Sequence, residues 1–207
     1  PYLIPRVALL DPELTLSVPE KITAETGMDA LTQLIESYVS VKKQPIPQAL
    51  AIYGIKLVGE NLATAVSHPN DLRAREAMLL ASLLSGISLA NSGLGAVHGI
   101  AAALGAYAHI PHGKACAMLL PKVMRVNLSH CVSEFAEIAD ALGVGAGLPE
   151  AQKAEKAVVA IEQLCQEIGI PSTFRSHELP AELLPVLVAG SQGSSMAGNP
   201  VKLTDTQ

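Results

Sequence analysis

Hydrophobic positions recur at helical spacing along most of this chain. After Leu31, the residues Ile35, Tyr38 and Val39 fall at the i+4, i+7 and i+8 positions that share one face of a helix. Similar patterns, interrupted by Pro and Gly, continue toward the other end of the sequence. They predict further helices over residues 47–67, 71–90, 95–108, 113–126, 129–142 and 149–168. The sequence therefore predicts an all-α fold, a helical bundle from residue 19 onward.

Turn-forming residues mark the ends of several of these helices. Asn70 follows His68 and Pro69 and is predicted to cap the helix that comes next. Pro149 is well placed as the first residue of the helix that follows a glycine-rich loop. From about Gly190 the chain is rich in Gly, Ser and Thr, and we expect a loop there.

The first 18 residues have a different pattern. PYLIPRVALLDPELTL combines a short apolar run with Asp-Pro, which predicts one strand over residues 1–10 followed by a turn. A single strand is not stable by itself, so we expect its partners to lie outside this chain or in a different arrangement. The sequence thus divides into a strand and linker, residues 1–18, and a helical domain, residues 19–207.

Composition excludes some functional classes. The chain has 207 residues, 49% of them apolar, which is enough for one domain with a core. Its net charge of −5 provides no basic patch for nucleic acid. The most apolar run, residues 77–90, is shorter than the roughly 20 residues of a membrane span, so we expect no membrane contact.

The three cysteines have no metal-binding or disulfide spacing and are predicted to be small core thiols. Free thiols without a recognisable signal peptide indicate a cytoplasmic protein.

Asp29 and Gln33 are four residues apart on a predicted helix, so they lie on one face about a turn apart. A carboxylate and an amide oxygen at that spacing could bind one cation. The alternative is structural: Thr26 and Asp29 also fit a capping box, in which Thr26 begins the helix. Gln33 could equally be a surface or core amide.

His98 and His112 are 14 residues apart, about 21 Å along a straight helix. Metal–nitrogen bonds are only about 2.0–2.1 Å, so the two imidazoles can share an ion only if the chain reverses between them. Pro111 and Gly113 supply such a break. The alternative is a buried, hydrogen-bonded His98 and a helix-capping His112.

Long motifs around these residues resemble the iron-containing alcohol dehydrogenase family, which is related in fold to glycerol dehydrogenase and dehydroquinate synthase. The resemblance rests on GMDALTQLIESYVS and GLGAVHGIAAALGAYAHIPHG. It extends through LDPELTLSVPEKITAETGMDALT, AMLLPKVMRVN and GNPVKLT. It implies the dehydroquinate synthase-like helical domain of that family. It also implies that the strand and linker, residues 1–18, are left from a nucleotide-binding domain.

The resemblance also implies a ligand shell. The metal-binding Asp of the family falls on Asp29, and its three metal-binding His fall on Gln33, His98 and His112. A further family His, linked to proton relay, falls on Ala102. An amide oxygen is a weaker donor than imidazole toward iron or zinc, so we expect altered binding at Gln33, with Fe²⁺ or Zn²⁺ still favoured by two imidazoles.

By the same resemblance, the metal would act as a Lewis acid on a small alcohol or aldehyde while hydride passes to or from NAD or NADP. His109, one turn before His112, is a candidate relay or substitute ligand, or else an exposed or capping residue. Leu14 is expected to face the nicotinamide. The pattern at Gly93, Gly95 and Gly99 does not match a dinucleotide fingerprint, because its last glycine is one position late and a helical segment precedes it.

The dinucleotide is therefore expected to bind mainly to an α/β domain outside this chain. The family also implies a homo-oligomer. Two other interpretations stay open: a degenerate, non-catalytic module that keeps this fold for assembly, and a plain helical bundle whose histidines are core residues.

Overall fold

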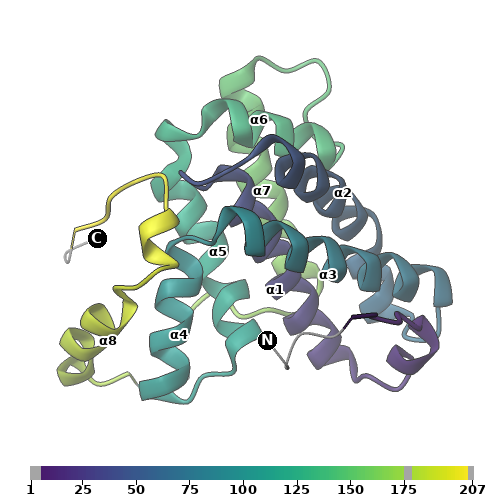
Figure 1. Cartoon of the computed structure of the whole chain (residues 1–207), viewed down its shortest axis with the longest axis horizontal. Helices are drawn as coiled ribbons and strands as arrows, with labels where there is room; N and C mark the ends of the chain where they lie inside the picture. Colours follow the sequence, from purple (N-terminus) through teal and green to yellow (C-terminus); the bar gives the residue numbers. More distant parts are fainter. Residues whose placement is uncertain (1–5, 175–178, 205–207) are drawn as a thin grey trace.

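The computed structural model describes residues 6–174 and 179–204, and over these residues the chain is helical without any β-strand. The predicted all-α class is confirmed (Figure 1). The described α-helices are α1 Glu20–Val39, α2 Pro45–Ser67, α3 Leu72–Ser92, α4 Ala96–Ala108, α5 His112–Asn127, α6 Val132–Ala141, α7 Glu150–Glu167 and α8 Leu184–Ser191. Short 3₁₀ helices between them are η1 Pro12–Thr15, η2 Leu128–His130, η4 Ala181–Leu183 and η5 Met196–Gly198.

Helix α1 runs through the middle of the bundle and packs against α2, α3 and α5 (Figure 1). Of its 20 residues 14 are buried, so it has almost no solvent face. Its apolar side chains Met28, Leu31 and Leu34 lie wholly inside the core. Because the helix is enclosed on most sides, its polar residues are also carried into the interior, where they need partners.

The chain reverses between α4 and α5, as the Pro and Gly residues there predict. Helix α4 ends at Ala108, and α5 begins at His112 with Pro111 as its N-cap. His109 takes the left-handed conformation at the end of α4, with φ of 53°. Gly113 lets the first turn of α5 rest directly on α1, because a Cβ there would lie 2.5 Å from the carbonyl oxygen of Glu25.

Two predicted helix starts are shifted by one residue. The N-cap of α3 is Asp71 and not Asn70, because the Asp71 carboxylate accepts the Ala74 N–H at 3.0 Å. Pro149 is the N-cap of α7, which begins at Glu150.

The loop predicted beyond Gly190 contains η5 and then a buried side chain, Asn199. Its Oδ1 accepts hydrogen bonds from the Ala96 N–H at 3.3 Å and from Asn127 Nδ2 at 2.9 Å. Its own Nδ2 donates to Asn127 Oδ1 at 3.0 Å. These bonds fasten the last described segment to the start of α4 and the end of α5 (Figure 1).

The strand expected over residues 1–10 is wrong for its described part, and residues 1–5 lie outside the described residues. Residues 7–11 have no regular structure, and the chain then enters η1, where the Asp11 carboxylate accepts the Glu13 N–H at 3.0 Å. A strand needs a neighbour for its backbone groups, and the described chain offers none. The division into domains at residue 18 stays a prediction.

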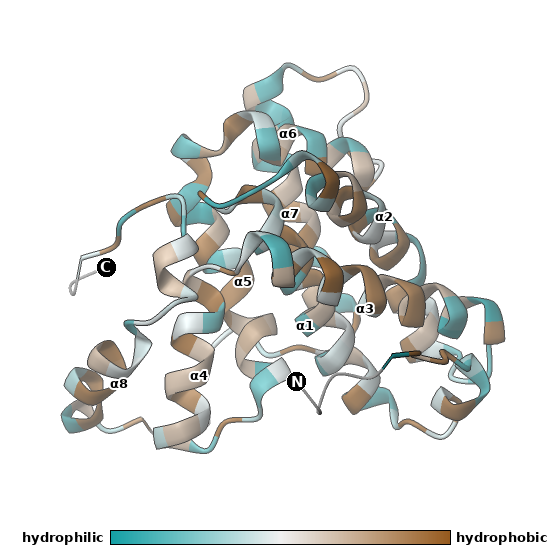
Figure 2. Ribbon diagram, in the orientation of Figure 1, coloured by the Kyte–Doolittle hydropathy of each residue, from teal (hydrophilic) through white to brown (hydrophobic). Residues whose placement is uncertain are grey.

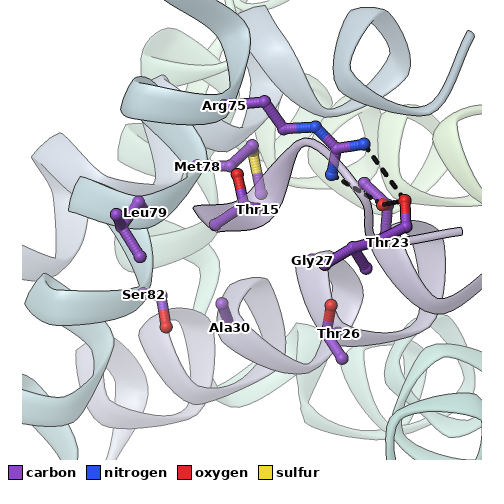
Figure 3. A pocket seen from close by; sticks show the side chains of 10 residues that line it. Thr15, Thr23, Thr26, Gly27, Ala30, Arg75, Met78, Leu79 and Ser82 are labelled. Carbon is purple, nitrogen blue, oxygen red and sulfur yellow. Dashed lines mark hydrogen bonds between the residues drawn. The ribbon is translucent and has the colours of Figure 1, made fainter. Parts of the chain in front are cut away.

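Arg75 fastens the segment before α1 to the bundle. Its buried guanidinium donates to Thr23 Oγ1 at 2.8 Å, to the Pro69 carbonyl at 2.9 Å and to the Val18 carbonyl at 3.3 Å. Beside these bonds, a pocket of about 160 Å³ opens between η1, α1 and α3 (Figure 3). The residue after Leu14, Thr15, lines this pocket.

Helix α2 has the length and apolar composition that a membrane span requires. It packs, however, against α1, α3 and α6, and buries Ile55, Val58 and Leu62 completely. Its outer face carries the Lys56–Glu60 ion pair at 3.9 Å. Figure 2 shows hydrophobic residues along both α2 and α3. One face of α2 is therefore part of the core of the bundle.

Candidate metal centre

Three helices bring Asp29, His98 and His112 together. Asp29 lies on α1, His98 on α4 and His112 on α5. Asp29 Oδ1 is 3.2 Å from His98 Nε2 and 3.7 Å from His112 Nε2. The two imidazole rings have their centroids 5.4 Å apart. The reversal between α4 and α5 therefore brings the two imidazoles side by side, as a shared metal site requires. They are neighbours although the histidines are 14 residues apart in the sequence.

The capping interpretation of Asp29 is wrong. Thr26 does not begin a helix, because α1 starts at Glu20 and Thr26 Oγ1 donates to the Ile22 carbonyl at 2.7 Å within it. Asp29 is thus a mid-helix carboxylate whose partners include the two histidines.

Cys116 is a fourth member of the cluster, and sequence reasoning missed it. The donor atoms of Asp29, His98, His112 and Cys116 all lie within 4.8 Å of one another. Cys116 Sγ is 3.6 Å from His112 Nε2, one turn earlier on α5. The thiol is buried, as predicted for a core cysteine, but it faces polar groups. The i, i+4 spacing from His112 was the available signal.

Gln33 lies beside this cluster. Its Nε2 donates to Asp29 Oδ1 at a long 3.4 Å, and its Oε1 accepts from Ser85 Oγ at 2.7 Å. The amide thus links Asp29 on α1 to Ser85 on α3. Its predicted role as a ligand stays a prediction.

Glu36 is a second residue that sequence reasoning missed. Its Oε2 is 2.7 Å from His98 Nδ1, and its Oε1 accepts the Val97 N–H at 2.6 Å. Glu36 is seven residues after Asp29, and so on the same face of α1. Gly95 makes this approach possible, since a Cβ there would lie 2.8 Å from Glu36 Oε1. One carboxylate therefore both caps the first turn of α4 and orients the His98 ring.

The electrostatics of the site favour an ion pair. Burial acts to raise the pKa of Asp29, but the hydrogen bond to His98 and the charges of His98 and His112 outweigh it and lower that pKa. Burial acts to lower the pKa of His98, but hydrogen bonds to Asp29, Cys116 and Glu36 outweigh it and raise that pKa. Burial raises the pKa of the Cys116 thiol to about 11. The cluster thus holds a positive charge between carboxylates.

Two other predicted site residues, His109 and Leu14, do not belong to the cluster. A third, Ala102, has no group that could relay a proton. His109 is exposed and caps α4, and it is not one of the four grouped donors. Leu14 is 77% exposed on η1, and the residue after it, Thr15, lines the pocket in Figure 3. Ala102 lies on α4 one turn after His98 and is exposed. Their functional roles stay predictions.

The chemistry of the four donors fits a divalent transition metal. Two imidazoles, a carboxylate and a thiol are the ligands that such ions prefer. In a tetrahedral site with bonds of about 2.0–2.3 Å, neighbouring donors lie roughly 3.3–3.8 Å apart. The distances here of 3.2, 3.6 and 3.7 Å are close to that range. All four donor atoms lie within 4.8 Å of one another, so small side-chain movements would bring them to one ion.

Comparison with known proteins identifies the family. Residues 23–207 match the family described as "Fe-containing alcohol dehydrogenase family, C-terminal". The chain is 38% identical over 207 residues to long-chain-alcohol dehydrogenase 1 of Geobacillus thermodenitrificans, covering 99% of this chain and 52% of that protein. It is 44% identical over 173 residues to 1,3-propanediol dehydrogenase of Klebsiella pneumoniae, covering 83% of this chain and 45% of that protein.

Solved structures show the same relationship. The crystal structure of a 1,3-propanediol oxidoreductase matches with a TM-score of 0.92 and 39% identity, over 95% of this chain and 52% of that one. Sulfoacetaldehyde reductase from Bifidobacterium kashiwanohense, solved in complex with NAD⁺, matches with a TM-score of 0.89 and 35% identity, over 98% and 52%. The chain spans about half the length of the curated relatives it matches. It belongs to the Fe-containing alcohol dehydrogenase family and corresponds to the C-terminal helical domain of that family.

Proposed function

We propose that this chain is the metal-binding helical half of an NAD(P)-dependent alcohol dehydrogenase or aldehyde reductase. The observation that carries the proposal is the convergence of Asp29, His98 and His112 from three helices in a chain of this family. Relatives named for 1,3-propanediol and lactaldehyde support a small alcohol or aldehyde as substrate, and one named for long-chain alcohols supports the alcohol class only.

The residues of the cluster have distinct tasks in this proposal. A bound Fe²⁺ or Zn²⁺ would act as a Lewis acid on the alcohol or carbonyl oxygen. Asp29 supplies negative charge, and His98 and His112 supply neutral nitrogen donors. Glu36 holds His98 by its other ring nitrogen, which fixes the ring orientation. The side chain of His112 is 49% exposed, so substrate approaches the cluster from the side of His112.

Further assignments rest on the family. NAD or NADP binds mainly to a nucleotide-binding domain outside this chain, with Leu14 close to the nicotinamide. His109 relays a proton at the solvent side of the site, and Gln33 occupies the sequence position of the family's remaining histidine ligand. The assembled enzyme is a cytoplasmic homo-oligomer.

A metal-binding titration tests the proposal. The purified chain, stripped with a chelator and titrated with Zn²⁺ or Fe²⁺, should bind one ion. His98→Ala should lower the affinity by more than about tenfold, because even residues that only support a ligand contribute about that much. The exposed His130 provides a matched control, and His130→Ala should bind like the parent. Absence of binding by the parent chain, or equal binding by His98→Ala, would contradict the proposal.

A second candidate is a non-catalytic module that keeps the fold for assembly. It is favoured by Gln33 and Ala102, which stand where the family resemblance expects histidines. A large gain in metal affinity from Gln33→His would support decay of the site. Aldehyde reduction at ordinary rates by a protein that joins this chain to a nucleotide-binding domain would argue against it.

A further inference from the structure

The amide of Gln33 forms hydrogen bonds with Asp29 and Ser85, and these use the groups that could otherwise face an ion. Its NH₂ group faces the Asp29 carboxylate, and its oxygen receives the Ser85 hydroxyl. An amide NH₂ donates hydrogen bonds but has no lone pair for a metal. In this arrangement Gln33 supports Asp29 and leaves the family's second ligand position without a donor.

Cys116 lies where a replacement donor is needed. It follows His112 by one turn of α5, and its sulfur is 3.6 Å from His112 Nε2. Its sulfur also lies within 4.8 Å of the donor atoms of Asp29 and His98. Three helices thus surround one buried sulfur with a carboxylate and two imidazoles.

The other two cysteines have no such surroundings. Cys165 Sγ donates to the Ala117 carbonyl at 3.6 Å, within the apolar core. Cys131 lies between η2 and α6 and is buried. Neither belongs to the four grouped donors. Burial alone therefore does not explain why Cys116 meets the histidines.

Resting on the proposed function, we propose that Cys116 is the fourth metal ligand, in place of the imidazole that Gln33 replaces, and that the site consequently prefers Zn²⁺ to Fe²⁺. On binding, the S–H bond breaks, a sulfur–metal bond forms and the proton leaves to solvent. The ligands then carry two negative charges, from Asp29 and the thiolate, which balance a divalent ion. A soft thiolate among nitrogen donors is typical of zinc sites.

Cobalt spectroscopy tests this assignment without any catalytic assay. Co²⁺ bound by a thiolate gives an intense sulfur-to-cobalt charge-transfer band in the near ultraviolet, which oxygen and nitrogen ligands do not give. The Co²⁺-loaded chain should show this band, and Cys116→Ser should abolish it. Cys116→Ser should also weaken Zn²⁺ binding by at least about tenfold. Cys165→Ser and Cys131→Ser are matched controls, and both should keep the band.

Two further variants distinguish the loss of a ligand from the loss of the fold. Gln33→Leu should change Zn²⁺ affinity only a few-fold, because Gln33 contributes no donor. Adding Gln33→His to Cys116→Ala should restore most of the lost affinity, because an imidazole returns to the shell. Helix content by circular dichroism shows which variants are folded.

The possible outcomes separate the inference from the proposed function. Cobalt bound without the band, or full Zn²⁺ affinity in folded Cys116→Ser, overturns the role of Cys116 and leaves the metal-binding half intact. Loss of binding in Gln33→Leu with the band unchanged in Cys116→Ser also overturns it. A parent chain that binds neither Co²⁺ nor Zn²⁺ overturns both.

Discussion

Glu36 shows how much one buried side chain contributes to this site. Its two carboxylate oxygens serve different partners, the Val97 N–H at the start of α4 and the His98 ring. The first contact sets where α4 begins, and the second sets how its histidine points. A carboxylate that fixes a metal-binding imidazole in this way contributes to affinity although it never touches the ion.

Replacing this carboxylate should therefore weaken metal binding. Glu36→Gln keeps the shape and one acceptor oxygen for Val97, but it removes the charge that holds His98. We expect a 10–100-fold loss of Zn²⁺ affinity, measured by competition with a chelating dye. Glu60→Gln, on the exposed face of α2, is the control and should have no effect. Unchanged affinity in Glu36→Gln would show that His98 needs no such support.

His98 and Asp29 should also make the stability of the metal-free chain depend on pH. The pKa of His98 is raised above its unfolded value of 6.5, so its contribution is fully present below pH 6.5 and is lost as pH rises through the folded pKa. The pKa of Asp29 is lowered below 3.8, so its contribution is present above pH 3.8 and is lost at more acidic pH. The free energy of unfolding should therefore fall as pH rises from 6.5.

Urea unfolding between pH 5 and pH 9 measures this slope. His98→Gln should flatten it, because the titrating group is removed. Since protons compete with the ion, Zn²⁺ affinity should rise over the same pH range. Equal slopes in the parent and in His98→Gln would exclude His98 as the source.

The helices that carry the ligands meet through backbone, not only through side chains. The first turn of α5 approaches α1 so closely that Gly113 has no room for a Cβ beside the Glu25 carbonyl. That contact determines how closely His112 and Cys116 on α5 approach Asp29 on α1. The site is thus positioned by helix packing, which in turn depends on one small residue.

A methyl group at this contact should separate the helices. Gly113→Ala places a Cβ 2.5 Å from a backbone oxygen that has no rotamer to change. We expect a loss of about 1–3 kcal/mol in the free energy of unfolding, together with weaker Zn²⁺ binding. Gly86→Ala is the control, because no atom lies within 4 Å of its added Cβ in α3. It should be neutral or stabilising by up to about 1 kcal/mol. Similar results for both variants would refute the close-packing argument.

The sequence predicted the helices well, but it did not predict which side chains contact one another across the fold. Apolar periodicity and the Pro and Gly residues located most helices to within a few residues, including the reversal that joins α4 to α5. Glu36 and Cys116 escaped because their partners are set by tertiary packing: Glu36 meets His98 across 62 residues of sequence. The strand was predicted from local composition, whereas pairing depends on a neighbour that the described chain lacks.

Over its described residues the chain buries a continuous core, and three of its most exposed large apolar side chains lie on one short stretch. Val7, Leu9 and Leu14 are 82%, 91% and 77% exposed on the stretch before α1. Each buried Å² of such surface contributes about 25 cal/mol, so association through this segment is favoured. We expect residues 7–14 to form a contact with a second polypeptide.

The chain alone should therefore self-associate through this stretch. Leu9→Lys combined with Leu14→Lys should shift size-exclusion elution toward the monomer at high protein concentration, because two charges cannot be buried without partners. Ile46→Lys removes an equally exposed apolar residue at the start of α2, 76% exposed, and is the control. A parent chain that is monomeric at every concentration, or an equal shift from Ile46→Lys, would disprove the assignment.

The hydrogen bonds of Asn199 tie α4, the helix that carries His98, to the last described segment of the chain. A protease that trims the chain just before this residue would free the Ala96 amide, whose acceptor is the Asn199 side chain. Deuterium would then enter that amide faster, although the cut lies 101 positions from His98 in sequence. Loss of Asn199 would thus loosen the first turn of α4, next to His98 of the candidate metal centre.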